Sequence, residues 1–206
     1  MNVPRRSAVL LTAALAATAL SGCSPAVETM SMIRDTAGAV GRDSDTGPDF
    51  FTGTAGPDLF TADGISTAYS AIADRAGAHP LQVVEVTIVP GAVTVQAVDP
   101  TAPTELNQWQ FSAATVPPPR PVDYDDDVEA LRQNLFAVDD VPAQNIATAI
   151  SGAVAASGIA DGEVSSLTIH RNLPFDENVV MFINVSGERS SKQVRADVSG
   201  HITEVI

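Results

Sequence analysis

The chain has 206 residues and carries 11 Lys and Arg against 25 Asp and Glu, which gives a formal net charge of -14. At 45% apolar and 17% charged residues it has enough apolar side chains for a buried core, which excludes wholesale disorder. Its single cysteine excludes a disulfide scaffold and a multi-cysteine metal cluster. Because few basic residues are available to neutralise phosphates, no nucleic-acid partner is expected.

The first residues have the organisation of an export signal. Arg5 and Arg6 form a basic start, and an uncharged apolar run follows over residues 8–20. This run is too short to cross a hydrocarbon core of about 30 Å, and it has the length of the apolar region of a signal peptide.

The signal ends in a motif that suggests a lipid anchor. Leu20-Ser21-Gly22-Cys23 resembles the lipobox of bacterial lipoproteins. The resemblance implies that Leu20, Ser21 and Gly22 are recognised by the lipoprotein signal peptidase, which cleaves before Cys23, and that the Cys23 thiol is diacylated. Acyl chains of this kind would hold the protein at the extracytoplasmic face of the cell membrane. The alternative is an ordinary secretory signal with a chance cysteine.

Composition divides the remainder into segments. Residues 1–22 are expected to be the signal peptide, and residues 23–57, rich in Gly, Ser, Thr, Asp and Pro, a lipid-anchored flexible tether. A Pro- and Asp-rich stretch over residues 117–124 predicts a linker. It separates a first folded unit, residues 58–116, from a second, residues 125–206.

The sequence predicts that the two units repeat one pattern. Phe60–Ile65 is similar to Phe136–Val141 at an offset of 76 residues, and in both an Asp is expected near the start of a helix. Apolar residues then recur at helical spacing, and Gly77 and Gly158 are expected to end the two helices. The apolar positions of the helices are Ile65, Tyr69, Ile72 and Ala76 in the first, and Ile146, Ile150 and Val154 in the second.

Alternating apolar and polar residues after each helix predict strands with one buried face. In the first unit the buried positions are expected to be Val84, Val86, Ile88, Val93, Val95, Ala97, Trp109 and Phe111. In the second they are Leu167, Ile169, Val179, Met181, Ile183, Val194, Ala196 and Val198, before a last strand over residues 201–206.

These elements predict an α+β fold of two similar units, each a helix packed on an antiparallel β-meander. The second unit has an extra leading helix, for which Asp125–Asp127 could supply the cap and Val128, Leu131 and Leu135 the apolar side.

The segment Val84–Pro103, with the form Val-x-Val, Pro-x-x-Val-x-Val and Asp-Pro-x-x-Pro, resembles a group of actinobacterial lipoproteins that also have a lipobox. That resemblance brings no activity with it. The tandem arrangement is more distantly similar to secreted beta-lactamase-inhibitor proteins and PepSY-type modules, which bind proteins; this is an analogy of fold only.

Sequence motifs for catalysis or cofactor binding are missing. No nucleophile elbow, P-loop, dinucleotide fingerprint or His-Glu-x-x-His occurs. His79, His170 and His201 are interpreted as loop and strand residues, and the acidic run Asp123–Asp127 as a solvated loop and helix cap rather than a calcium site. We therefore expect no enzyme, cofactor or metal.

The strand around Phe182 offers a candidate interaction surface. If Met181 faces the helix, Val180 and Phe182 lie on the opposite face of the sheet, where the first unit has the polar Thr94 and Gln96. The two units could pack through this face, the strand could be central and covered, or the patch could bind a partner.

The sequence thus predicts a non-catalytic envelope lipoprotein. It would present a sheet face or the groove between its units to an envelope protein or peptide. Two alternatives remain open: a carrier of an apolar lipid ligand, and a hydrolase with a polar site around His170 or His201.

Overall fold

The computed structural model describes residues 56–206. The signal peptide, the lipobox residues Leu20, Ser21, Gly22 and Cys23, and the tether up to residue 55 lie outside the described residues. None of the helices within residues 56–206 is long and apolar enough to cross a membrane.

Helices and strands follow one another in the order expected of two helix-plus-sheet units. The first half consists of α1 (Ala62–Ala76), β1 (Gln82–Val89), β2 (Ala92–Asp99), β3 (Ala102–Ser112) and β4 (Arg120–Pro121). A connecting segment contains α2 (Val128–Asn134), β5 (Phe136–Ala137) and a 3-10 turn (Val138–Asp140). The second half consists of α3 (Ala143–Ser157), β6 (Glu163–Arg171), β7 (Val179–Ser186), β8 (Ser191–Asp197) and β9 (Ile202–Val205).

The strands of both halves form one sheet, with the order β4-β3-β2-β1-β6-β7-β8-β9 and β5 paired to β1. All pairs are antiparallel, and the halves meet where β1 pairs with β6, with Val86 opposite Ile169 and Ile88 opposite Leu167. The predicted α+β class, with helices packed on an antiparallel sheet, is confirmed. The halves share one continuous sheet and are not separated.

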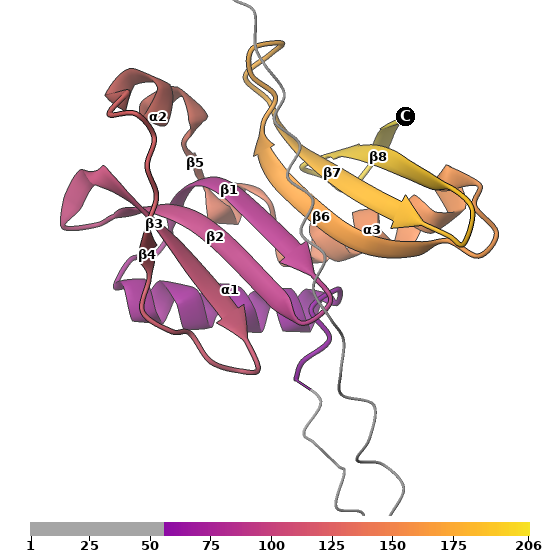
Figure 1. Cartoon of the computed structure of the whole chain (residues 1–206), viewed down its shortest axis with the longest axis horizontal. Helices are drawn as coiled ribbons and strands as arrows, with labels where there is room; N and C mark the ends of the chain where they lie inside the picture. The colour runs from indigo at the N-terminus through magenta and orange to yellow at the C-terminus, as the bar shows by residue number, and fades with distance from the viewer. Residues whose placement is uncertain (1–55) are drawn as a thin grey trace, which may run out of the picture. The chain divides into compact units, whose positions relative to one another are not determined.

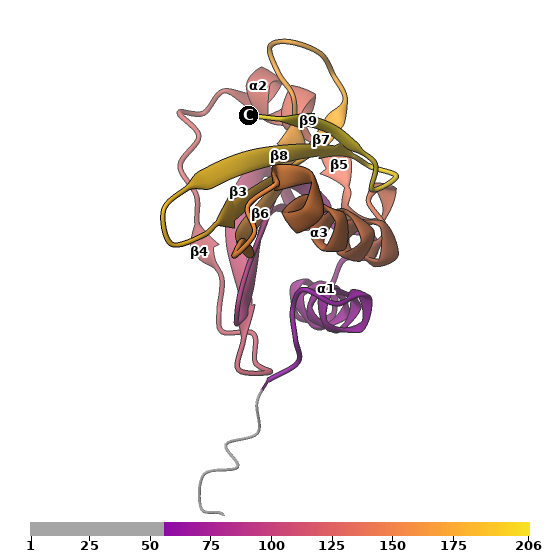
Figure 2. The same cartoon turned by 90° about the vertical axis from the view of Figure 1, so that its right-hand side faces the viewer.

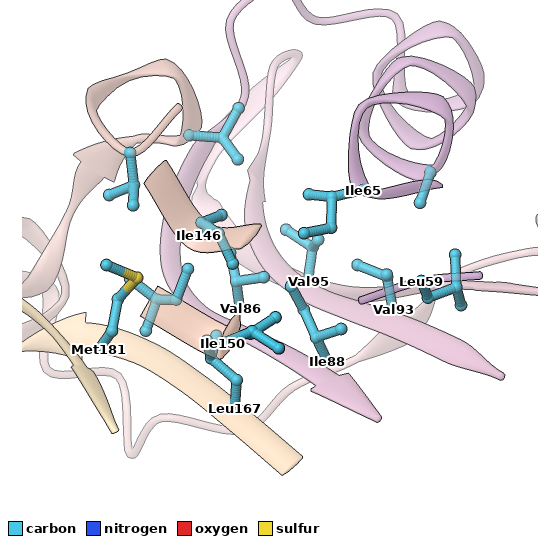
Figure 3. Close-up of a cluster of buried hydrophobic side chains, with 14 of the residues drawn as sticks. Leu59, Ile65, Val86, Ile88, Val93, Val95, Ile146, Ile150, Leu167 and Met181 are labelled. Carbon is cyan, nitrogen blue, oxygen red and sulfur yellow. The ribbon is translucent and has the colours of Figure 1, made fainter. Parts of the chain in front are cut away.

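Both long helices cover the same face of this sheet (Figures 1 and 2). Figure 3 shows Ile65 of α1 and Ile146 and Ile150 of α3 directed at the strand residues between them. The fully buried side chains of both halves belong to a single apolar cluster. Burial of this shared face therefore holds the two halves together, in addition to the pairing of β1 with β6.

The predicted ends of both helices are confirmed, as is the predicted start of α1, which has Asp63 in its first turn, whereas the predicted start of α3 is wrong. Gly77 and Gly158 both adopt the left-handed conformation that ends a helix, with φ of 72° and 68°. The start of α1 is capped by Thr61, whose hydroxyl accepts a hydrogen bond from the Gly64 N–H. Asp139 lies in the 3-10 turn and does not open α3, which begins after Pro142.

The sequence similarity between Phe60–Ile65 and Phe136–Val141 does not match equivalent elements. Phe60 precedes α1, whereas Phe136 lies in β5 and pairs with Val83 of β1. A short segment of apolar and acidic residues is compatible with a helix start and also with a strand followed by a turn. The similarity of these two segments therefore does not show which elements of the two halves are equivalent.

Two predicted core positions are wrong. A β-bulge between Val83 and Glu85 shifts the alternation of β1, so that Val83 is buried and Val84 turns to the opposite face of the sheet. Val198 follows β8 in the turn before β9 and is exposed.

The linker and the extra helix both contact the first half. Arg120 and Pro121, in the predicted linker, pair with Gln108 and Asn107 at the edge of the sheet. The predicted cap of α2 is confirmed, since the Asp127 carboxylate accepts a hydrogen bond from the Ala130 N–H at 2.9 Å. Although the sequence places α2 in the second unit, the helix packs against β1.

Candidate functional site

A groove of about 760 Å³ opens where the two halves meet. The first half contributes the segment before α1, the turn between β1 and β2 and the end of β3, while α3 and the start of β6 come from the second half. The residues that line the groove are Gly56, Pro57, Asp58, Leu59, Phe60, Pro90, Gly91, Phe111, Ala113, Ile150, Ser151, Val154, Gly162, Glu163 and Val164.

Local interactions hold the segment before α1 against the groove. The Asp58 carboxylate accepts a hydrogen bond from the Phe60 N–H at 3.0 Å. The Asp58 carbonyl oxygen accepts one from the Thr61 hydroxyl at 2.7 Å. Leu59 is buried in the shared core, and this anchors the segment so that Phe60 is partly buried beside the groove.

The opposite wall is formed by α3. Ile150 is buried, Val154 is partly buried, and Ser151 is exposed. These positions follow from the helical spacing, which places residues 150, 151 and 154 along adjoining sides of one helix. Ser151 is therefore a position where a larger side chain could enter the groove without displacing the core.

The remaining apolar surface of the groove comes from strand ends. Phe111 of β3 is buried and Val164 of β6 is partly buried. Between them lies the tight turn at Gly91, whose φ of 97° suits glycine. Apolar side chains from both halves thus make up most of the lining, as in small-molecule and peptide sites.

Among residues 56–206, the charged side chains that line the groove are the acidic Asp58 and Glu163. Both residues are exposed, and within the part of the chain that the structure describes no Lys or Arg belongs to the lining. The groove therefore combines an apolar interior with a negatively charged rim.

The predicted partner patch lies on the other face of the sheet. Met181 and Ile183 are buried in the core, and Val180 and Phe182 lie on the opposite face, partly buried. The halves join edge to edge through β1 and β6, so this face is not the contact between them.

Phe182 contacts side chains of both flanking strands. The His170 ring of β6 stacks on it with a centroid separation of 4.7 Å, and the Arg195 guanidinium of β8 lies 5.1 Å from its ring centre. Arg195 also forms an ion pair with Glu204 at 2.9 Å. On the face predicted to be an apolar patch, the Phe182 ring is thus stacked on an imidazole ring and lies beside a charged guanidinium.

A row of residues that are all polar except Phe182 crosses this face of the sheet. Residues paired in register run from β3 to β9 in the order Gln110, Thr94, Thr87, Thr168, Phe182, Arg195 and Glu204. Along this row the first half is therefore polar, and Thr94 and Gln96 lie on this face as predicted.

A smaller hollow of about 360 Å³ lies on the same face beneath α2. It includes Leu106 and Leu131, which are buried outside the main core, together with Asp123, Asp127 and His170. The Asp127 side chain caps α2, and that of Asp123 accepts a hydrogen bond from the Asp125 N–H. The acidic run thus forms a loop and a helix cap, as predicted.

The three histidines do not share a site. His79 lies 3.2 Å from the Asp74 carboxylate on the exposed end of α1. His170 uses Nδ1 in a 2.8 Å contact with the carbonyl oxygen of its neighbour Arg171. His201 lies in the turn that leads into β9.

The turn at His201 contains a serine and an aspartate, but not in the order of a catalytic triad. The Ser199 hydroxyl donates to the Asp197 carboxylate at 2.6 Å and lies 2.9 Å from His201 Nδ1. This bond from Ser199 is the main reason that the pKa of Asp197 is lowered. The carboxylate therefore orders the turn through the serine rather than orienting the imidazole, which a triad requires.

Within residues 56–206 no group of three or more His, Cys, Asp or Glu side chains is placed to hold a metal ion.

Sequence reasoning suggested a groove between the units without naming its residues. The sequence places Phe60 at the start of the first unit, and Ile150 and Val154 on one helix face. Their convergence depends on the pairing of β1 with β6, which alternation within single strands does not reveal.

Comparison with protein-family models gives no match, and comparison with curated proteins gives none either. Among solved structures, the chain is similar to a putative lipoprotein from Clostridium difficile 630. The two have 14% sequence identity and a TM-score of 0.49, over 65% of this chain and 86% of that one.

Proposed function

We propose that this chain is a non-catalytic lipoprotein of the cell envelope, anchored through Cys23 at the extracytoplasmic face of the membrane. Its folded body binds a protein or peptide partner, and the groove between the halves accepts apolar side chains of that partner. The observation that carries the proposal is the apolar groove of about 760 Å³ at the junction of the halves.

The size and the lining of the groove support this assignment. Binding sites for small ligands span about 300–1,000 Å³ and are mostly apolar with a few polar groups. The groove lies within this range, whereas on the opposite face the Phe182 ring is already in contact with His170 and Arg195. A partner would gain more apolar burial in the groove than on the sheet face.

The anchor is tested with Cys23→Ala. Replacement of the thiol removes the site of acylation, and we expect loss of incorporated labelled palmitate together with loss of the mature protein from washed membranes. Normal labelling and membrane retention of the variant would contradict the anchor.

Partner binding is tested by affinity purification from crosslinked envelopes. The native chain is compared with Ser151→Trp, which fills the groove from an exposed helix position, and with Glu105→Lys, which changes an exposed residue on β3 outside the groove lining. We expect a dominant protein that is retained by Glu105→Lys and lost with Ser151→Trp. Equal retention by both variants would contradict the groove as the binding site.

The same apolar lining also favours a second function, carriage of an acyl ligand. Mass spectrometry of organic extracts of the purified chain distinguishes the two. A stoichiometric lipid that is lost with Ser151→Trp, in the absence of a protein partner, would replace the proposed function by this alternative.

A further inference from the structure

The groove has a distribution of charge that restricts its ligand. Its apolar side chains lie inside, and the two ionisable groups of the lining, Asp58 and Glu163, are both exposed carboxylates. The Asp58 carboxylate accepts a hydrogen bond from the Phe60 N–H, which leaves its second oxygen without a hydrogen-bond partner among the described residues. Glu163 forms no ion pair within residues 56–206.

The two carboxylates come from different halves of the molecule. Asp58 precedes α1, and Glu163 begins β6, so the acidic groups flank an apolar lining that includes Phe60, Phe111 and Val154. A ligand bound to this lining would have its ends near the Asp58 and Glu163 carboxylates. Anionic end groups would be repelled, and cationic ones attracted.

We infer that the groove binds an extended peptide segment whose apolar core is flanked by Lys or Arg. The apolar side chains enter the groove, and the basic flanking residues lie near Asp58 and Glu163. This inference rests on the proposed function and specifies its partner. Charge complementarity favours this ligand over a fatty acid, whose carboxylate would be repelled by the same rim.

The inference is tested with three fluorescein-labelled, amidated pentapeptides: Lys-Leu-Phe-Leu-Lys, Ser-Leu-Phe-Leu-Ser and Glu-Leu-Phe-Leu-Glu. The protein is the chain from residue 23 onward with Cys23→Ser, which retains the tether. Fluorescence anisotropy gives Kd, and amide chemical shifts of groove residues such as Phe60, Gly91 and Val154 locate the peptide.

We expect the lysine peptide to bind most tightly and the glutamate peptide most weakly. Glu163→Lys should weaken binding of the lysine peptide about two- to fivefold and strengthen that of the glutamate peptide, as an exposed charge pair would. The charge-matched control Glu105→Lys should change neither, because Glu105 does not line the groove. Ser151→Trp should abolish binding of all three peptides.

The outcomes separate this inference from the proposed function. Equal affinities for the three peptides, with shifts in the groove, would overturn the charge preference and leave the proposed function intact. Chemical-shift changes outside the groove would overturn both the inference and the proposed function. Binding of laurate, tested as a fatty-acid probe, in the absence of binding of any peptide would also overturn both. Phe50 and Phe51 precede the groove segment in the sequence and could themselves compete with a peptide. If the lysine peptide binds only when both are replaced, Phe50→Ser and Phe51→Ser, the groove belongs to the chain's own preceding segment and the inference is overturned.

Discussion

At the residue scale, two helical glycines have opposite roles. A Cβ atom at Gly64 in α1 would lie 2.0 Å from the Asp58 carbonyl oxygen, whereas at Gly152 in α3 it would lie 3.8 Å from the Ile202 side chain. The segment that contains Asp58 can therefore lie against α1 only because position 64 has no side chain.

This difference predicts opposite effects of the same substitution. Gly64→Ala should lower the free energy of unfolding by about 1–3 kcal/mol, because the backbone of the groove wall must move. Gly152→Ala should raise it by about 0.5–1 kcal/mol through helix propensity. Urea unfolding of both variants measures these changes, and equal effects would contradict the close approach at Gly64.

Tyr69 gives the chain a specific response to alkali. Its hydroxyl is buried without a hydrogen-bond partner among residues 56–206, and burial raises its pKa above the usual value near 10. Above pH 10 the unfolded chain loses this proton while the folded chain keeps it, so stability falls as pH rises.

Tyr69→Phe should remove this contribution to the alkaline loss. At pH 7 the variant should be at least as stable as the native chain, because it no longer buries an unpaired hydroxyl. Urea unfolding at pH 7 and pH 11 tests both statements. An unchanged difference in stability between the two pH values would show that the Tyr69 hydroxyl is not the group responsible.

Side-chain alternation predicted most buried residues, including Val93, Val95, Leu167 and Ile183, because each strand has one face on the core. It failed at Val84, since a bulge inserts one residue and reverses the alternation locally. It also placed Phe182 on the correct face, but it did not reveal the stack on His170, because that contact depends on the register in which β6 pairs with β7.

At the element scale, α2 is held to the sheet by a small apolar contact. Leu131 and Leu106 are both buried, and neither belongs to the main core. The sequence predicted the helix and its Asp127 cap from local signals, but not its location, which depends on contacts with strands of the first half.

Leu131→Ala should therefore destabilise α2 more than the rest of the fold. We expect the free energy of local opening of α2 to fall by about 2 kcal/mol, which is seen as faster hydrogen exchange confined to residues 128–134. Gln133→Ala, on the exposed side of the helix, is the matched control and should change the stability by less than about 0.5 kcal/mol. Uniformly faster exchange throughout the sheet in Leu131→Ala would contradict a local role.

At the scale of the whole molecule, the continuous sheet and the shared core predict cooperative unfolding. The sequence predicted two units because each half has the pattern of a helix followed by strands. It could not show that β1 pairs with β6, since the buried faces of separate and joined meanders have the same alternation.

Unfolding in urea should accordingly follow a single transition. Fluorescence of Trp109, the single tryptophan, reports the first half, and amide signals of β7 report the second. We expect the two curves to coincide. Two separate midpoints would show that the halves are independent domains and that the groove between them is not a stable feature.

The most direct test of the central claim is photo-crosslinking in intact cells from single positions on the chain. A benzophenone amino acid is placed at Ser151 in the groove, at Val180 on the sheet face, and at Glu105 as a control outside the groove lining. The account predicts one protein or peptide adduct from position 151 and none from position 105. Adducts from position 180 alone, or only lipid adducts from position 151, would contradict it.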